Sequence, residues 1–219
     1  EPLGALDLKL RRQMQIELKR IQTEVGTTFV HVTHDQEEAM TMADTIAVMN
    51  AGRIEQLGDP ASIYELPRTV FVANFLGQSN LFAGTRVSTD ANMIEVMANG
   101  TKFLVPTERN AASGDEIIIG VRPEKITVLD FPDREKVPTG HNTLEGRVVD
   151  VSYAGVSTQY LITLPWGQNI TVFEQNVVVG DRCNVGDQVV VHWSPDHTFG
   201  LAGGETLLVS TAQALAAGV

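Results

Sequence analysis

The first quarter of the chain repeats apolar residues at every third or fourth position. Lys, Arg, Gln and Glu occupy most of the places between them. This period is typical of an amphipathic helix with one apolar face, and Gly26 is well suited to end such a helix in a left-handed conformation. The sequence therefore predicts a helix that ends near Val25, with an apolar face formed by Leu6, Leu10, Met14, Leu18, Ile21 and Val25.

A mixed α/β pattern follows this helix. Residues 28–32 are β-branched or aromatic apart from His31, which predicts a strand with that histidine as a packed residue. Thr33 and Gln36 have the spacing of a capping box, which predicts a helix that continues through Ala43. The remaining expected elements are a strand at 45–49, a turn at 50–52, its hairpin partner at 53–57, a helix from Asp59-Pro60 to Pro67, and a helix at 70–76 that ends at Gly77.

The pattern changes after Gly77. Helical periodicity disappears, and short runs with β-type residues alternate with clusters of turn residues, as in small barrels. A connector at 131–141, with Pro, Asp and Gly, separates two sets of strands, and Gly114-Asp115 and Gly186-Asp187 each introduce a late strand. This repetition indicates two related small barrels, at about 77–130 and 142–205. The predicted strands are 81–87, 93–97, 102–105, 116–121, 125–129, 144–153, 158–164, 169–173, 188–193 and 198–201.

Composition and charge narrow the class of protein. The 219 residues are 43% hydrophobic and carry a net charge of −11, which fits a folded chain and argues against nucleic acid as a partner. No apolar run reaches the roughly 20 residues of a bilayer span, so direct membrane insertion is not expected. The single cysteine, Cys183, allows no intramolecular disulfide and is expected to be a partly exposed free thiol.

Two short stretches in the first part carry the candidate chemistry. They are Glu1-Pro2-Leu3-Gly4-Ala5-Leu6-Asp7 and Thr33-His34-Asp35. Taken alone, they are a turn, a helix cap at Asp7 and a histidine near a helix start. Their order resembles the second half of an ABC-transporter ATPase, in which a glutamate ends the Walker B strand, a loop reading roughly (S/G)-A-L-D follows, and a lone histidine comes after the next strand.

The resemblance assigns roles to three residues. Glu1 would be the general base that activates the attacking water, His34 the histidine that reaches the γ-phosphate, and Asp7 the loop aspartate that touches the opposite nucleotide site. The alternatives from the residues alone remain a solvated acid at Glu1, a solvated capping-region histidine at His34 and a plain helix cap at Asp7. In the full-length protein the resemblance implies ATP and Mg²⁺ as cofactors.

Other elements of such an ATPase are absent from the chain. It contains no G-x-x-x-x-G-K-[ST] phosphate loop and no L-S-G-G-Q-like signature. We therefore expect residues 1–76 to be the C-terminal part of an ATPase domain, an incomplete α/β remnant, and residues 77–219 to be a regulatory β-barrel domain. No nucleotide is expected to bind this piece alone, which is predicted to be inactive.

The second part resembles the TOBE-type, oligonucleotide-binding-like domain of importer ATPases. The segment Gly120-Val121-Arg122-Pro123-Glu124 is close to the family's G-(I/V)-R-P-E motif. Segments 156–160, 173–176 and 193–197 look most like the spermidine/putrescine (polyamine) branch, with iron and sugar importers as neighbours. Arg122 and Glu124 are candidates for ion pairs between the two parts.

The resemblance also implies partners and location. The parent protein would form a homodimer, bind membrane permease subunits, and lie in the cytoplasm on the inner face of the plasma membrane. The alternative for the isolated chain is a non-catalytic regulatory, dimerisation or ligand-sensing module. No metal site is predicted, because His192 and His197 with one acid in a turn fall short of a ligand set.

Overall fold

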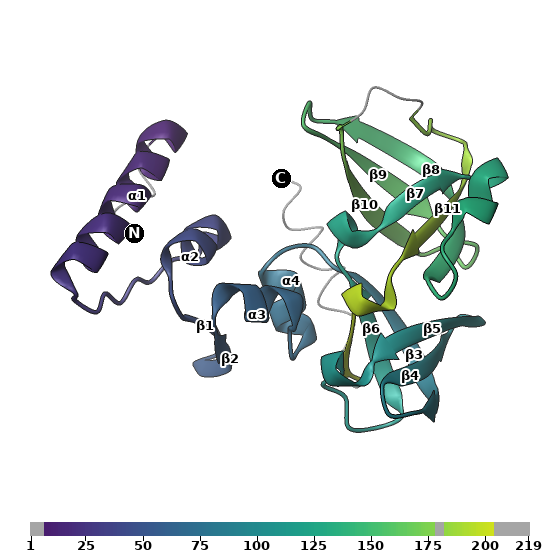
Figure 1. Ribbon diagram of the computed structural model, residues 1–219, viewed down its shortest axis with the longest axis horizontal. Coiled ribbons are helices and arrows are strands. Elements are labelled where there is room, and N and C mark those ends of the chain that lie inside the picture. Colours follow the sequence, from purple (N-terminus) through teal and green to yellow (C-terminus); the bar gives the residue numbers. More distant parts are fainter. Residues whose placement is uncertain (1–6, 178–181, 204–219) are drawn as a thin grey trace.

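The computed structural model describes residues 7–177 and 182–203 (Figure 1). A helical part at the N-terminal side is followed by two antiparallel β-sheets. Figure 1 shows helices α1 and α2 at one end of the molecule and the sheets at the other, with α3 and α4 between them. The helices are α1 (Leu8–Val25), α2 (Gln36–Met42), α3 (Pro60–Glu65) and α4 (Val70–Phe75).

The caps of helix α1 match the sequence prediction. The carboxylate of Asp7 accepts a hydrogen bond from the Leu10 amide at 3.0 Å, which satisfies one of the free N–H groups at the helix start. Gly26 ends the helix in the left-handed region at φ 67°, where a residue without Cβ is not strained.

The segment between α1 and α2 differs from its prediction. Residues 27–33 form no strand, so the predicted strand at 28–32 is wrong. β-branched side chains favour an extended backbone, but a strand also needs a neighbour for its hydrogen bonds, and no described strand pairs with this segment. The predicted capping box is wrong as well, because α2 begins after Asp35, whose carboxylate accepts the Glu38 amide.

The hairpin and the helices after it agree with the pattern. Strands β1 (Ile46–Asn50) and β2 (Arg53–Gly58) pair antiparallel around the turn at Ala51 and Gly52. Apolar residues of β1 pack with α3 and the α4 segment into one cluster, against which Ala39, Met40 and Ala43 from α2 and its end also pack. The buried members are Ile46, Val48, Ile63, Val72 and Leu76.

Ten strands form the β-domain, which we define as the described residues from Asn80 on. The first sheet has the order β12-β6-β3-β4-β5 and the second β10-β9-β8-β11-β7. The first contains β3 (Asn80–Thr89), β4 (Met93–Ala98), β5 (Thr101–Pro106), β6 (Glu116–Val121) and β12 (Thr198–Ala202). The second contains β7 (Thr127–Asp130), β8 (Asn142–Tyr153), β9 (Ser157–Thr163), β10 (Asn169–Gln175) and β11 (Gln188–Trp193).

The two halves of the β-domain repeat one strand order but exchange a strand. β6 leads through the 3₁₀ helix η2 (Pro123–Lys125) into β7, which pairs with β11 in the second sheet. β11 leads through η4 (Pro195–His197) into β12, which pairs with β6 in the first sheet. Each half thus gives its last strand to the other sheet, and neither sheet contains only residues from 77–130 or only residues from 142–205.

One apolar core joins the two sheets. Phe82 stacks on Phe103 at a centroid distance of 5.3 Å, and Phe103 stacks on Trp193 of the other sheet at 6.0 Å. Two asparagines add matching cross-sheet bonds: the Asn80 amide pairs with the backbone of Thr171, and the Asn142 amide with that of Leu104. Buried amides that satisfy both donor and acceptor fix the register of one sheet on the other.

Candidate functional site

His34 lies in a turn whose flanking residues, Thr33 and Asp35, are hydrogen-bonded to their neighbours, and its own side chain is exposed. The Thr33 hydroxyl accepts the Asp35 amide at 2.9 Å and donates to the Glu38 carboxylate at 2.8 Å. His31 is not part of a strand; its Nε2 lies 3.3 Å from the same carboxylate. We call residues 33–35 the His34 turn. The hydrogen bonds of Thr33 and Asp35 fix the backbone of this turn.

Helix α1 is tied to the His34 turn and to α2 by charged side chains. Arg11 lies 3.3 Å from Asp35, Arg12 lies 3.0 Å from Glu37, and Lys19 lies 2.6 Å from Asp44. Such ion pairs each contribute little to stability, but together they connect α1 with Asp35, with Glu37 of α2 and with Asp44 just after α2. Asp7 and His34 therefore belong to neighbouring, connected elements. Glu1 lies outside the described residues.

The described groups around His34 do not make a nucleotide site by themselves. Asp35, Glu37 and Glu38 are acids, and the nearby cation Arg11 already pairs with Asp35. A triphosphate needs convergent N–H groups and cations, which a phosphate loop supplies and this sequence lacks. The residues present can therefore contribute to an ATP site but do not fit ATP alone.

Arg122 joins the helices to the β-domain in a way that the sequence did not reveal. It was expected to form an ion pair, but its guanidinium is 1% exposed and donates to four oxygen atoms, none of them a carboxylate. Burial lowers the pKa of Arg122, and the four acceptors offset part of the lost hydration. The acceptors are the carbonyl oxygens of Tyr64, Ala73 and Gln78 and the hydroxyl of Ser79.

Glu124 and its neighbours add polar contacts at the same junction. Its carboxylate accepts the Tyr64 hydroxyl at 2.7 Å. Glu65 lies 3.0 Å from Lys125 and 3.6 Å from Arg109. The motif residues therefore do connect the two parts, through hydrogen bonds for Arg122 and Glu124 and through an ion pair for Lys125.

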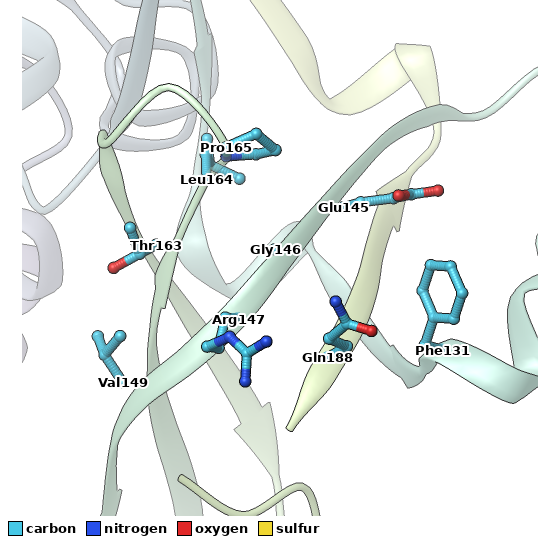
Figure 2. A pocket seen from close by; sticks show the side chains of 9 residues that line it. All are labelled: Phe131, Glu145, Gly146, Arg147, Val149, Thr163, Leu164, Pro165 and Gln188. Atoms are coloured by element: carbon cyan, nitrogen blue, oxygen red, sulfur yellow. The ribbon is translucent and has the colours of Figure 1, made fainter. Parts of the chain in front are cut away.

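A pocket of about 380 Å³ lies on the second sheet, on the face away from the core (Figure 2). Figure 2 shows Phe131 and Glu145 on one side of β8, and Thr163, Leu164 and Pro165 on the other. The Arg147 guanidinium at this pocket already donates to the Gly186 carbonyl at 2.7 Å. The lining combines apolar side chains with the charged Glu145 and Arg147 and the polar Thr163 and Gln188. A second cavity, of about 330 Å³, lies between β2, α3 and η1 (Thr107–Arg109).

The remaining titratable candidates have structural partners. Cys183 is a partly buried free thiol, as predicted, and donates to Asp130 at 3.2 Å. Burial and this carboxylate raise its pKa to about 12, so it is not a nucleophile at neutral pH. His192 faces His141, with 3.0 Å between their Nδ1 atoms. Within residues 7–177 and 182–203, no three His, Cys, Asp or Glu side chains could hold a metal ion together.

The second part of the chain is similar to a known domain family. Residues 119–201 match the family model of the TOBE domain. The matched residues run from β6 to β12 and include the Gly-Val-Arg-Pro-Glu motif, so this part of the two-sheet domain is similar to TOBE domains. None of the helices in the described part of the chain has the length and apolar character needed to cross a bilayer.

The chain as a whole is similar to spermidine/putrescine import ATP-binding proteins named PotA. It is 47% identical over 207 residues to that of Thermobifida fusca, a match that covers 93% of this chain and 52% of the relative. The identity is 43% over 206 residues for Rubrobacter xylanophilus, with the same two coverages. These relatives confirm the resemblance to the polyamine branch, and the chain spans about half of their length. A cytoplasmic molybdate-binding protein, ModG, shares 19% identity at a TM-score of 0.48, over 55% of this chain and 94% of its own.

Proposed function

We propose that this chain is the C-terminal half of the ATP-hydrolysing subunit of an ABC importer for a polyamine. The observation that carries the proposal is the 43–47% identity, over 92–93% of the chain, to proteins named as spermidine/putrescine import ATP-binding proteins. Their greater length leaves room for the phosphate loop that this sequence lacks. Residues up to 76 would be the remnant of the ATPase domain, and residues from 77 the regulatory domain.

The proposed roles follow the resemblance. Glu1 would orient or deprotonate the water that attacks the γ-phosphate, and Mg²⁺ would offset charge on the phosphoryl oxygens when nucleotide is bound. His34 would contact the γ-phosphate, and its exposed side chain on a fixed turn is compatible with that role. Asp7 caps α1 through one carboxylate oxygen, which leaves the other for the opposite nucleotide site of a homodimer.

The parent would work on the cytoplasmic face of the membrane with permease subunits. Polyamine is the preferred solute, with sugar or iron as neighbouring alternatives. The second candidate function, for the isolated chain, is a non-catalytic regulatory or dimerisation module. The TOBE domain with its own core and a pocket of about 380 Å³ favours that reading for the piece alone.

The test uses the full-length gene in cells that lack their own polyamine importer. We expect labelled spermidine and putrescine uptake, and its loss when His34 is replaced by Ala. Val156→Ser, at an exposed valine of the β8–β9 turn with no assigned role, is the control. Uptake that competes with a sugar or with ferric ion, and not with spermidine, would reject the solute. Normal uptake by the His34→Ala variant would reject the role of His34.

Calorimetry with Mg-ATP tests whether the isolated chain binds nucleotide or is a non-catalytic regulatory or dimerisation module. We expect no micromolar binding and no hydrolysis, because most phosphate contacts come from a loop that is absent here. Micromolar binding by this chain would show that its own residues suffice for a nucleotide site.

A further inference from the structure

Arg122 is placed where two helices end. Tyr64 lies in the last turn of α3 and Ala73 in the last turn of α4, and their carbonyl oxygens accept from Arg122 at 2.9 and 2.7 Å. The last carbonyls of a helix have no partner within it and carry partial negative charge, so a cation is favoured there. A single guanidinium from the β-domain thus satisfies the ends of both helices.

The turn that contains Arg122 does not itself require an arginine. The second half of the β-domain makes the equivalent turn, from β11 through η4 into β12, with Ser194 in the corresponding place. Backbone angles agree closely: φ −74° and ψ 141° at Arg122, and φ −62° and ψ 138° at Ser194. A proline follows each residue. The buried charge in the first half therefore serves a contact outside the turn.

That contact leads to the His34 turn through continuous packing. Val72 and Leu76 of the α4 segment and Ile63 of α3 lie in the apolar cluster that Ala39, Met40 and Ala43 contact. These three residues belong to α2 or its end, and α2 begins directly after Asp35, which caps it. On its other face, α4 places Val70 and Ala73 against Ile118 and Phe199 of the first sheet.

Gly77 leaves little room for a side chain beside the guanidinium. At Gly77, an added Cβ would lie 3.2 Å from the Tyr64 ring and 3.5 Å from Nη1 of Arg122, and the φ of 128° disfavours any other residue. The guanidinium carbon of Arg122 lies over the face of the Tyr64 ring, 4.1 Å from the ring centroid. The buried Arg122 charge, the Tyr64 ring and the turn at Gly77 thus hold α3 and α4 in one position on the β-domain.

We propose that Arg122 is the positioning residue through which the β-domain sets the place of the His34 turn. This inference rests on the proposed function for its effect on ATP hydrolysis. Arg122 touches neither nucleotide nor solute and acts through α3, α4 and α2. Any change in the β-domain that displaced Arg122 would displace the His34 turn with it, so a regulatory signal from the TOBE domain would reach the ATPase by this route.

The experiment has two arms and one matched control. The variant is Arg122→Ser, because Ser194 shows that serine supports the same turn. The control is Arg86→Ser, since Arg86 also donates to backbone carbonyls, those of Ala112 and Gly114, but within the β-domain. The first arm measures hydrogen exchange in the 219-residue chain. We expect amides of α2, α3, α4 and the β1–β2 hairpin to exchange about tenfold faster or more in Arg122→Ser only, with both sheets unchanged.

The second arm measures ATPase activity of the full-length protein with its permease. We expect kcat to fall about tenfold in Arg122→Ser with little change in the KM for ATP, since a displaced His34 affects the reaction more than nucleotide binding. Unchanged exchange in the helices, or loss of protection throughout both sheets, would overturn the proposal. So would faster exchange with normal kcat. A wild-type protein without ATPase activity would instead reject the proposed function, while the exchange arm still tests the connection.

Discussion

Arg122 and Tyr64 contact each other twice. The guanidinium carbon lies 4.1 Å from the centroid of the Tyr64 ring, and Nη2 donates to the carbonyl oxygen of the same tyrosine at 2.9 Å. Two residues further on, Glu124 accepts the Tyr64 hydroxyl at 2.7 Å. Burial, and then this carboxylate, raise the Tyr64 pKa to about 12, so the phenol remains a donor at neutral pH. Arg122 and Glu124 of the motif thus contact the ring, the backbone carbonyl and the hydroxyl of Tyr64.

The contacts of Tyr64 predict a graded loss of stability. Tyr64→Phe removes only the bond to Glu124 and should lower the free energy of unfolding by about 0.5–1.5 kcal/mol. Tyr64→Leu also removes the aromatic face and should cost about 0.5–2 kcal/mol more. Urea unfolding measures both. Tyr153→Phe is the control, because the Tyr153 ring is exposed under Arg182. Equal stability of Tyr64→Phe and the wild type would contradict the role of the hydroxyl.

Gly120 predicts a steric effect in the same motif. A Cβ at this position would overlap the ring of Phe199 on the neighbouring strand. Gly120→Ala should therefore destabilise the fold by about 1–3 kcal/mol, because the core cannot move the ring away freely. Gly114→Ala is the matched control: an added Cβ there meets nothing within 4 Å. Thermal unfolding of the two variants should differ clearly, and identical midpoints would mean that Phe199 relaxes without cost.

The sequence was most informative where local signals decide the structure. Helix α1 carries a cap at each end, Asp7 and Gly26, and short β-type runs between clusters of turn residues mark the strands of the β-domain. Those elements depend on residues within a few positions of one another. The same is true of Asp7 as a helix cap, the part of the candidate site that a local pattern could predict.

Pairing across the chain could not be predicted in this way. The composition of 28–32 favours a strand, but only a neighbouring strand would make one, and none of the described strands lies beside it. The exchange of β7 and β12 is equally hidden, because a strand's sequence shows which face is buried and not which sheet it joins. Arg122 was misinterpreted for the same reason, since its acceptors lie 43 to 58 residues away.

The pair of His141 and His192 predicts a pH dependence. His192 is 7% exposed, and burial followed by the nearby His141 lowers its pKa. Since the unfolded chain then takes up a proton first, His192 favours the fold above its ordinary pKa of about 6.5, and that stability is lost as pH falls. His197 acts in the same direction, whereas the raised pKa of Glu174 acts in the opposite one.

His192→Gln separates these contributions. The variant should lose less in thermal midpoint than the wild type when the pH falls from about 7.5 to about 5.5, because the unfolded-state proton uptake at this site is gone. An unchanged pH dependence in His192→Gln would assign the effect to other groups.

The apolar surface near the N-terminal side predicts self-association of this chain. Val30 is 90% exposed and Val32 is 80% exposed, and Ile16 and Phe29 add apolar surface in the same region of the chain. Each apolar side chain removed from water contributes roughly 1.5–3 kcal/mol, so a second copy that covers this segment is favoured. We expect sedimentation at micromolar concentration to show dimers or larger species.

Substitutions distinguish this segment from the β-domain as the contact. Replacing Val30 and Val32 together by Ser should shift the chain toward the monomer, whereas Val156→Ser, at an equally exposed valine of the β8–β9 turn, should leave the association unchanged. A truncation that starts at Asp44 removes α1 and α2 but keeps α3 and α4 over Phe199 and Leu201. Truncation at Gly77 would expose Phe199 and Leu201 and create more new apolar surface in the β-domain, so Asp44 is the better boundary. If the Asp44 version still dimerises, the contact does not need the residues before Asp44; a monomeric full chain would refute self-association altogether.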